Sequence, residues 1–74
     1  MKLSLDLHGV RHSNVSREVD KFIGKHLMNG SDEVEIIIGM SESMKNIVDS
    51  TISDYGLESE YGFLTKSKLI IKLK

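Results

Sequence analysis

Polar and apolar residues alternate strictly at the start of the chain. Leu3, Leu5 and Leu7 occupy every second position, with polar residues between them. A period of two is typical of a strand that has one apolar and one polar face. The pattern therefore predicts a strand over residues 2–8.

A longer apolar series follows at helical spacing. It consists of Val15, Val19, Phe22, Ile23 and Leu27. Gly30 then supplies a residue that readily adopts the left-handed conformation found after helices. The series predicts a helix over residues 12–29, with Ser13 or Asn14 accepting a hydrogen bond from a backbone N–H at its start. His12 is an alternative first residue of this helix.

The middle of the chain predicts a second strand and a second helix. Residues 34–38 form a short β-branched run, which is typical of a largely buried strand. This strand completes a βαβ unit with the first strand and helix, so the two strands should be parallel. Further apolar residues at helical spacing predict a helix over residues 43–54 that begins at Ser41 or Ser43.

The end of the chain predicts two more strands, over residues 57–61 and 68–74, joined by a loop that contains Gly62. The predicted order is βαβαββ. We therefore expect an α/β fold of the α+β sandwich kind, in which two helices pack on a four-stranded mixed sheet. A chain of 74 residues has room for one small domain, so we assign residues 1–74 to a single domain.

The composition excludes several kinds of protein. The chain has no Cys, which rules out disulfides, zinc–thiolate sites and thiol nucleophiles. Its 39% hydrophobic and 28% charged residues are typical of an ordered, soluble chain. The opening residues lack the apolar run of a signal peptide, and no apolar run approaches the ~20 residues that span a bilayer. We therefore expect a cytoplasmic protein with no membrane partner.

The net charge of −1 conceals an uneven distribution of charges. Residues 1–31 have five basic and three acidic side chains, residues 32–60 have one and eight, and residues 61–74 have four and none. The basic ends would form a positive, phosphate-binding face if the first and last strands lay close together. The candidates in the last strand are Lys68, Lys72 and Lys74. The alternative is that these lysines protect an exposed edge strand.

Asp6 and His8 are the main candidates for chemistry. They are two residues apart, so they share the polar face of the first strand, at its carboxyl end. Ligands of open α/β sheets bind beyond this end of parallel strands, and Gly9 lets the backbone turn there. A carboxylate beside an imidazole suits general acid–base work near neutral pH. The alternative is that both residues only form the turn.

Other polar residues are expected at the same edge of the sheet. Gly39 and Ser41 belong to the loop after the second strand, whose N–H groups and hydroxyl make a weak anion site; the alternative is an ordinary capped loop. His12 could face the same crevice and Arg11 could contact phosphate; the alternative for each is a solvated helix start. No metal site is predicted, because Asp6 and a single His are too few ligands.

Residues 5–9, with the sequence Leu-Asp-Leu-His-Gly, resemble the opening motif of the Smr (small MutS-related) domain family. The resemblance continues through Asp20-Lys21-Phe22, where the family has a D-R-F-like segment in an amphipathic helix, and reaches the second strand. The family has the same βαβαββ order, and its members are associated with cleavage of DNA or RNA. The resemblance implies that Asp6 and His8 are the pair linked to cleavage.

The chain departs from the family at the second loop. The family's H-G-x-G loop is matched only at Gly39, because Ile38 replaces its His, Met40 its basic residue and Ser41 its second Gly. This departure puts the part of the site that would grip the substrate in question.

Two main hypotheses follow for the function. The first is an Smr-type endonuclease that cleaves RNA with Asp6 and His8. RNA is favoured over DNA because RNA carries its own nucleophile, the 2′-hydroxyl. No cofactor is then required, whereas DNA would need a divalent metal.

The second hypothesis is a catalytically weak or inactive module that binds nucleic acid or the ribosome. The candidate nucleic-acid contacts are Gly9, Arg11, His12, Gly39, Ser41, Lys68, Lys72 and Lys74. A domain that acts on a protein partner is a third hypothesis, which no motif supports.

Overall fold

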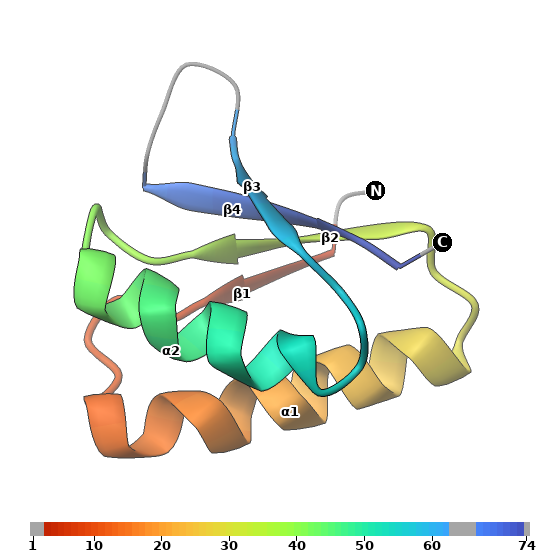
Figure 1. Cartoon of the computed structure of the whole chain (residues 1–74), viewed down its shortest axis with the longest axis horizontal. Coiled ribbons are helices and arrows are strands. Elements are labelled where there is room, and N and C mark those ends of the chain that lie inside the picture. Colours follow the sequence, from red (N-terminus) through yellow and green to blue (C-terminus); the bar gives the residue numbers. More distant parts are fainter. Residues whose placement is uncertain (1–2, 63–66, 74) are drawn as a thin grey trace.

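The computed structural model describes residues 3–62 and 67–73. Its elements follow the order β1 (Ser4–Asp6), α1 (His12–Met28), β2 (Glu33–Ile37), α2 (Glu42–Ser53), β3 (Ser59–Tyr61) and β4 (Lys68–Lys72). The strands form one four-stranded sheet, and both helices lie on the same side of it (Figure 1). The predicted βαβαββ order and the sandwich of two helices on a mixed sheet are therefore confirmed.

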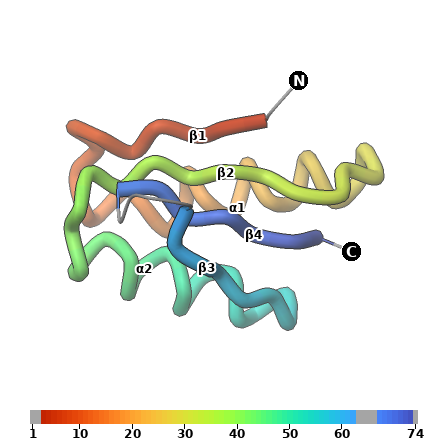
Figure 2. The backbone as a smooth tube through the Cα atoms, turned by 90° about the horizontal axis from the view of Figure 1, so that it is seen from above, coloured from red at the N-terminus to blue at the C-terminus, as the bar shows by residue number. Residues whose placement is uncertain are grey.

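The strand order across the sheet is β1-β2-β4-β3. β1 runs parallel to β2, with Leu5 opposite Ile36, and β4 runs antiparallel to both β2 and β3. The first and last strands of the chain are thus separated by β2, and β1 and β3 form the two edges (Figure 2).

Three strands are shorter than predicted: β1, β3 and β4, which ends at Lys72. β1 ends at Asp6 rather than at residue 8, because the N–H of Val10 donates to the carbonyl of Leu7 (2.9 Å) and closes a turn there. β3 begins at Ser59 rather than at residue 57, because the N–H of Leu57 still bonds the last turn of α2 (3.2 Å). The outermost residues of the two predicted terminal strands lie outside the described residues.

The start of α1 corrects the predicted cap. The helix begins at His12 and its N-cap is Arg11, not Ser13 or Asn14. The N–H of Asn14 donates to the carbonyl of Arg11 (2.8 Å), and no side chain in the described part of the chain caps this end. The reason is that the chain leaves the preceding turn in an extended conformation at Arg11 (φ −66°, ψ 141°), which is the conformation of an N-cap.

The start of α2 confirms one of the two predicted caps. The Oγ of Ser41 accepts a hydrogen bond from the N–H of Met44 (3.1 Å). Glu42 follows in the first turn, where a carboxylate interacts favourably with the helix dipole.

The hydrophobic core lies between the sheet and the two helices. On or just after the two central strands, every second residue is buried: Val34, Ile36, Ile38, Leu69, Ile71 and Leu73. The helices contribute Val15, Val19, Ile23, Met44, Val48 and Ile52. Burial of each such side chain contributes about 1.5–3 kcal/mol. The packing therefore fixes which face of each element points inward, and the polar ends of the strands remain at the rim of the sandwich.

Candidate nucleic-acid interface

The carboxyl end of β1 turns sharply at His8 and Gly9. The hydrogen bond from Val10 to Leu7 closes a β-turn over residues 7–10. Gly9, the third residue of the turn, has a φ of +85°, which residues with a side chain rarely adopt. The N–H of Leu7 still donates to a carbonyl of β2 (2.9 Å), so the turn is anchored directly to the sheet. The side chain of His8 is exposed at its tip.

Asp6 bonds the backbone of this turn. Its Oδ1 accepts a hydrogen bond from the N–H of His8 (2.8 Å). An Asp side chain that bonds the backbone two residues further on is a common stabiliser of turns. The structure therefore brings Asp6 and His8 together, but this hydrogen bond reaches the backbone of His8 instead of its imidazole.

The loop after β2 lies against His8. A Cβ added to Gly39 would lie 3.4 Å from Cδ2 of the His8 imidazole. Gly39 and Met40 both have left-handed backbone conformations, with φ of +64° and +62°. The N–H groups of Ile38 and Gly39 donate to the carbonyl of Ser67, at 2.7 and 3.3 Å. The start of β4 therefore holds this loop in place beside the first turn.

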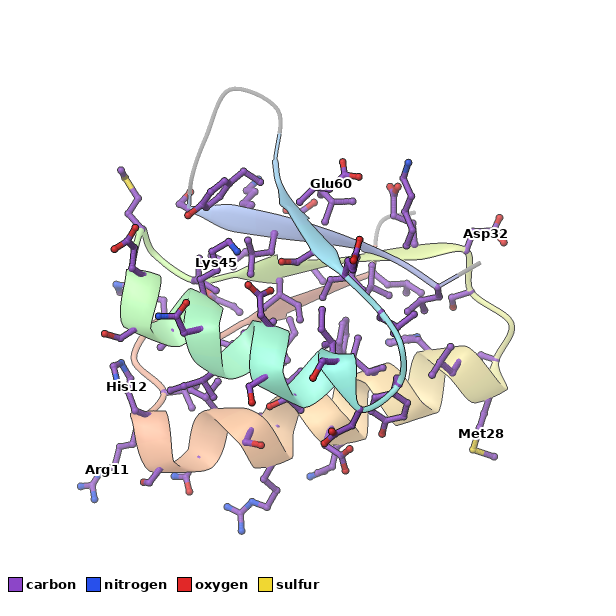
Figure 3. The ribbon with its side chains drawn as sticks, viewed as in Figure 1. Arg11, His12, Met28, Asp32, Lys45 and Glu60 are labelled. Atoms are coloured by element: carbon purple, nitrogen blue, oxygen red, sulfur yellow. The ribbon has the colours of Figure 1, made fainter. Side chains whose placement is uncertain are left out.

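Both helices begin at the same end of the sandwich as these two loops (Figure 1). Arg11 and His12 are exposed at the start of α1, and Arg11 extends away from the body of the protein (Figure 3). The first backbone N–H groups of α1 carry partial positive charge, which favours a nearby anion. Ser41 lies at the start of α2, where its hydroxyl serves as the helix cap. The group that shares this end is named the strand-end site here: His8, Gly9, Arg11, His12, Gly39 and Ser41.

The lysines of β4 lie on the open face of the sheet beside glutamates of β2. Nζ of Lys68 is 3.3 Å from Oε1 of Glu35, a residue that is only 7% exposed. Lys72 lies directly across from Glu33 at the opposite end of the sheet, about 13 Å along β4 from Lys68. Because β2 separates β1 from β4, acidic residues interrupt the positive face expected from the two basic ends. Lys74 lies outside the described residues.

A cation and an aromatic ring meet between α2 and β3, a combination that the sequence did not suggest. Nζ of Lys45 lies 5.3 Å from the centroid of the Tyr61 ring and 2.6 Å from Oδ2 of Asp49. The hydrogen bond to Asp49 raises the pKa of Lys45 above its ordinary value. Asp49 also accepts a hydrogen bond from Ser59 at the start of β3. The four-residue spacing of the Lys–Asp pair could have been found in the sequence, but the place of Tyr61 depends on the fold.

The part of the chain that the structure describes contains neither a cluster of metal ligands nor a membrane-spanning helix. Within the described residues, no three His, Asp or Glu side chains come together in a way that could hold a metal ion. Among residues 3–62 and 67–73, no helix has the length and apolar character needed to cross a membrane.

Comparison with known proteins identifies the family. The family model for the Smr domain matches residues 5–66, which is most of the 74-residue chain. The match begins in β1 and includes the first turn, both helices and the loop after β2. No curated protein and no solved structure matches the chain. Smr domains bind nucleic acids in general, and the exposed strand-end site is compatible with such a ligand. The chain therefore belongs to the Smr domain family and is a module of the nuclease or nucleic-acid-binding type.

Proposed function

We propose that this Smr domain binds RNA at the strand-end site and cleaves it with His8 as the general base. The observation that carries the proposal is the placement of His8, an exposed imidazole at the tip of a turn with Gly39 against its ring. Gly9 follows His8 directly in the turn. Because Gly9 has no side chain and a Cβ there would meet nothing within 4 Å, a sugar–phosphate backbone can approach from that side, while Gly39 leaves room for the imidazole against the loop after β2.

RNA itself supplies the nucleophile for this reaction. Neutral His8 takes the proton of a 2′-hydroxyl while the 2′-oxygen attacks the adjacent phosphorus. The bond from phosphorus to the 5′-oxygen breaks, and that oxygen takes a proton from water. The products are a 2′,3′-cyclic phosphate and a 5′-hydroxyl, and His8 then releases its proton to solvent. This route needs neither a metal ion nor a nucleophile from the protein.

Arg11 and the start of α1 add positive charge at the same end of the sandwich as His8. Arg11 and His12 are exposed at the start of α1, where the backbone N–H groups of the helix add partial positive charge. Such groups stabilise the negative charge that develops on phosphate oxygens during the reaction. Asp6 acts in this proposal as a positioning residue, because its carboxylate holds the turn that presents His8.

The test is an incubation of the purified chain with labelled single-stranded RNA, with and without a chelator. We expect cleavage that the chelator does not change. His8→Ala should lower the cleavage rate about 100-fold or more, the usual contribution of a general acid–base, while RNA binding persists. Cleavage by His8→Ala at the rate of the unaltered protein would rule out this role for His8.

Two Asp6 variants separate positioning from direct chemistry. Asp6→Asn keeps an oxygen that can accept the N–H of His8, whereas Asp6→Ala removes it. We expect Asp6→Asn to retain most of the cleavage rate and Asp6→Ala to lose it. Equal loss in both variants would show that the negative charge itself is needed, which would give Asp6 a direct role.

The binding part of the proposal is tested with two basic residues. Arg11→Ala should weaken RNA binding whatever the RNA sequence. It should also lower the slope of log affinity against log salt concentration by the contribution of about one phosphate contact. Lys72→Ala is the matched comparison, because Lys72 lies beside Glu33 at the far end of the sheet, and we expect a smaller loss. A larger loss with Lys72→Ala than with Arg11→Ala would contradict binding at the strand-end site and would indicate an RNA site on β4 instead.

A module that binds nucleic acid without cleaving it is the second candidate. The observation that favours it is Ile38, which is buried in the core at the position of the family's loop histidine. This second candidate predicts RNA affinity that depends steeply on salt, together with no cleavage products in the assay above.

A further inference from the structure

β1 forms an edge of the sheet with an outward-facing backbone. The N–H of Leu7 and the carbonyl of Leu3 both bond β2. Backbone groups alternate in direction along a strand, so those of Ser4 and Asp6 point away from the sheet. In the described part of the chain no other element lies beyond β1 (Figure 2). A strand edge of this kind is a template for pairing with a further strand.

A groove runs beside this edge between β1 and α1. It has a volume of about 230 Å³ and is lined by Leu5, Glu18, Lys21, Phe22 and Lys25. Leu5 and Phe22 are only partly buried, although both pack against the hydrophobic core. The groove thus adds apolar side chains to the unpaired backbone of β1.

The groove has an acidic residue toward one end and a basic residue toward the other. Glu18 lies toward the start of α1 and Lys25 lies two turns further on, about 10.5 Å along the helix axis. Lys21 and Phe22 lie between them, and all four residues line the groove together with Leu5. A two-fold rotation about the middle of the groove would therefore place an acid opposite a base at each end.

We propose that this surface docks a second copy of the chain, through antiparallel pairing of β1 with β1 about a two-fold axis at Leu5. This pairing places Ser4 opposite Asp6 of the second copy in hydrogen-bonded positions and Leu5 opposite Leu5. The Leu5 pair occupies a non-hydrogen-bonded position, where the Cα atoms are about 4.5 Å apart and the side chains meet most closely. The four-stranded sheet then continues into that of the second copy.

The Glu18 and Lys25 pairs at the two ends of the groove favour a second copy as the occupant, while Lys21, which lies near the axis, is exposed and can extend into solvent. In the antiparallel arrangement Glu18 meets Lys25 of the second copy, and the same pair forms again on the other side of the axis. A closed two-fold contact uses one patch twice, and this patch carries both members of the ion pair. The contact area of a three-residue strand and two helical turns is small, so the dimer should be weak and dependent on concentration.

The experiment is sedimentation velocity on the full chain from roughly 10 µM to 1 mM, the range that reports weak association. We expect the mass to rise from one chain toward two. Lys25→Glu should weaken the dimer about tenfold or more, because it turns two attractive pairs into repulsive ones. The double variant Glu18→Lys/Lys25→Glu should restore dimerisation, since it exchanges the charges. Arg17→Glu is the control, because Arg17 is exposed on the same helix but does not line the groove.

A second variant tests the pairing of the strands. Ser4→Pro removes an N–H that points away from β2, so the sheet should form as before while the edge can no longer pair at that position. Circular dichroism and thermal unfolding check the fold of every variant. A monomer at every concentration would overturn the proposal, as would a dimer that Lys25→Glu leaves unchanged. The readout is mass in the absence of RNA, so it does not depend on the proposed cleavage.

Discussion

Substitution of Gly39 by alanine would perturb two separate features of the strand-end site. The first is the backbone, because Gly39 has a φ of +64° and an L-residue pays a penalty for the left-handed conformation. The second is the contact with the imidazole, because the new Cβ would lie 3.4 Å from Cδ2 of His8. Gly30→Ala is a matched control, since Gly30 has a similar φ of +73° and a Cβ there would meet nothing within 4 Å.

The two substitutions should cost the same stability. The left-handed conformation costs alanine about 1–2 kcal/mol. In a chain of 74 residues with a total stability of roughly 4–11 kcal/mol, this should lower the melting temperature by roughly 4–16 °C. The contact with His8 should add little to this loss, because the exposed imidazole can shift by a few tenths of an ångström. Thermal unfolding followed by circular dichroism measures both losses.

The imidazole should respond to only one of the two substitutions. The proton on Cδ2 of His8 gives a resolved NMR signal, which is assigned by its disappearance in His8→Ala. We expect this signal to shift in Gly39→Ala and to stay in place in Gly30→Ala, with His12 and His26 unaffected in both. The cleavage rate should follow the same pattern. An unchanged His8 signal in Gly39→Ala would refute the contact between the loop after β2 and the first turn.

Three further predictions concern stability. Ile36→Ala should cost about 2–5 kcal/mol and Ile36→Val only about 0.5–1.5 kcal/mol in urea unfolding, because Ile36 is fully buried on a central strand; equal losses would contradict this packing. Thr51→Val should cost about 0.5–1.5 kcal/mol, because the buried hydroxyl of Thr51 bonds the carbonyl of Ile47 (2.8 Å) and the hydroxyl of Ser16 (3.0 Å); exposed Ser50→Ala is the control and should change little. The hydrogen bond to Asp20 raises the pKa of Tyr55 in the folded protein, so its stabilisation is complete below the unfolded-state pKa of about 10 and is lost as the pH rises through the folded value. Tyr55→Phe should therefore show a smaller fall in melting temperature above pH 10, and identical alkaline profiles would show that this bond does not contribute.

Much of the strand-end site could be predicted because it follows directly from local sequence. Asp6 and His8 lie two residues apart at the end of an alternating segment and Gly9 follows, so the sequence predicts both side chains on the polar face of the first strand, at its carboxyl end, with a turn at Gly9. The sequence does not predict the hydrogen bond from the N–H of His8 to the carboxylate of Asp6. The reason is that an Asp at this spacing can bond either the backbone N–H or the imidazole of a His two residues later. The cap at Arg11 was missed for a similar reason, since the cap depends on where the chain leaves the turn and not on residue type alone.

The basic face is the clearest case in which the sequence was insufficient. The two ends of the chain are basic, but the strand order inserts β2 between β1 and β4. Lys68 consequently lies beside Glu35, and Lys72 lies across from Glu33. Nothing in the spacing of these residues along the chain indicates which strands are neighbours.

The amino-acid sequence by itself determined the type and order of the elements, the inward face of each one and the location of His8 at a strand end. These properties follow from periods of two and 3.6 residues and from the preferences of glycine, which act within a few residues. The tertiary structure alone decided that Gly39 packs against His8, that glutamates accompany the lysines of β4, and that β1 is an outer strand of the described sheet beside the groove that it forms with α1. These features depend on pairing between residues far apart in the chain, which is selected by burial of the common core and not by any local pattern.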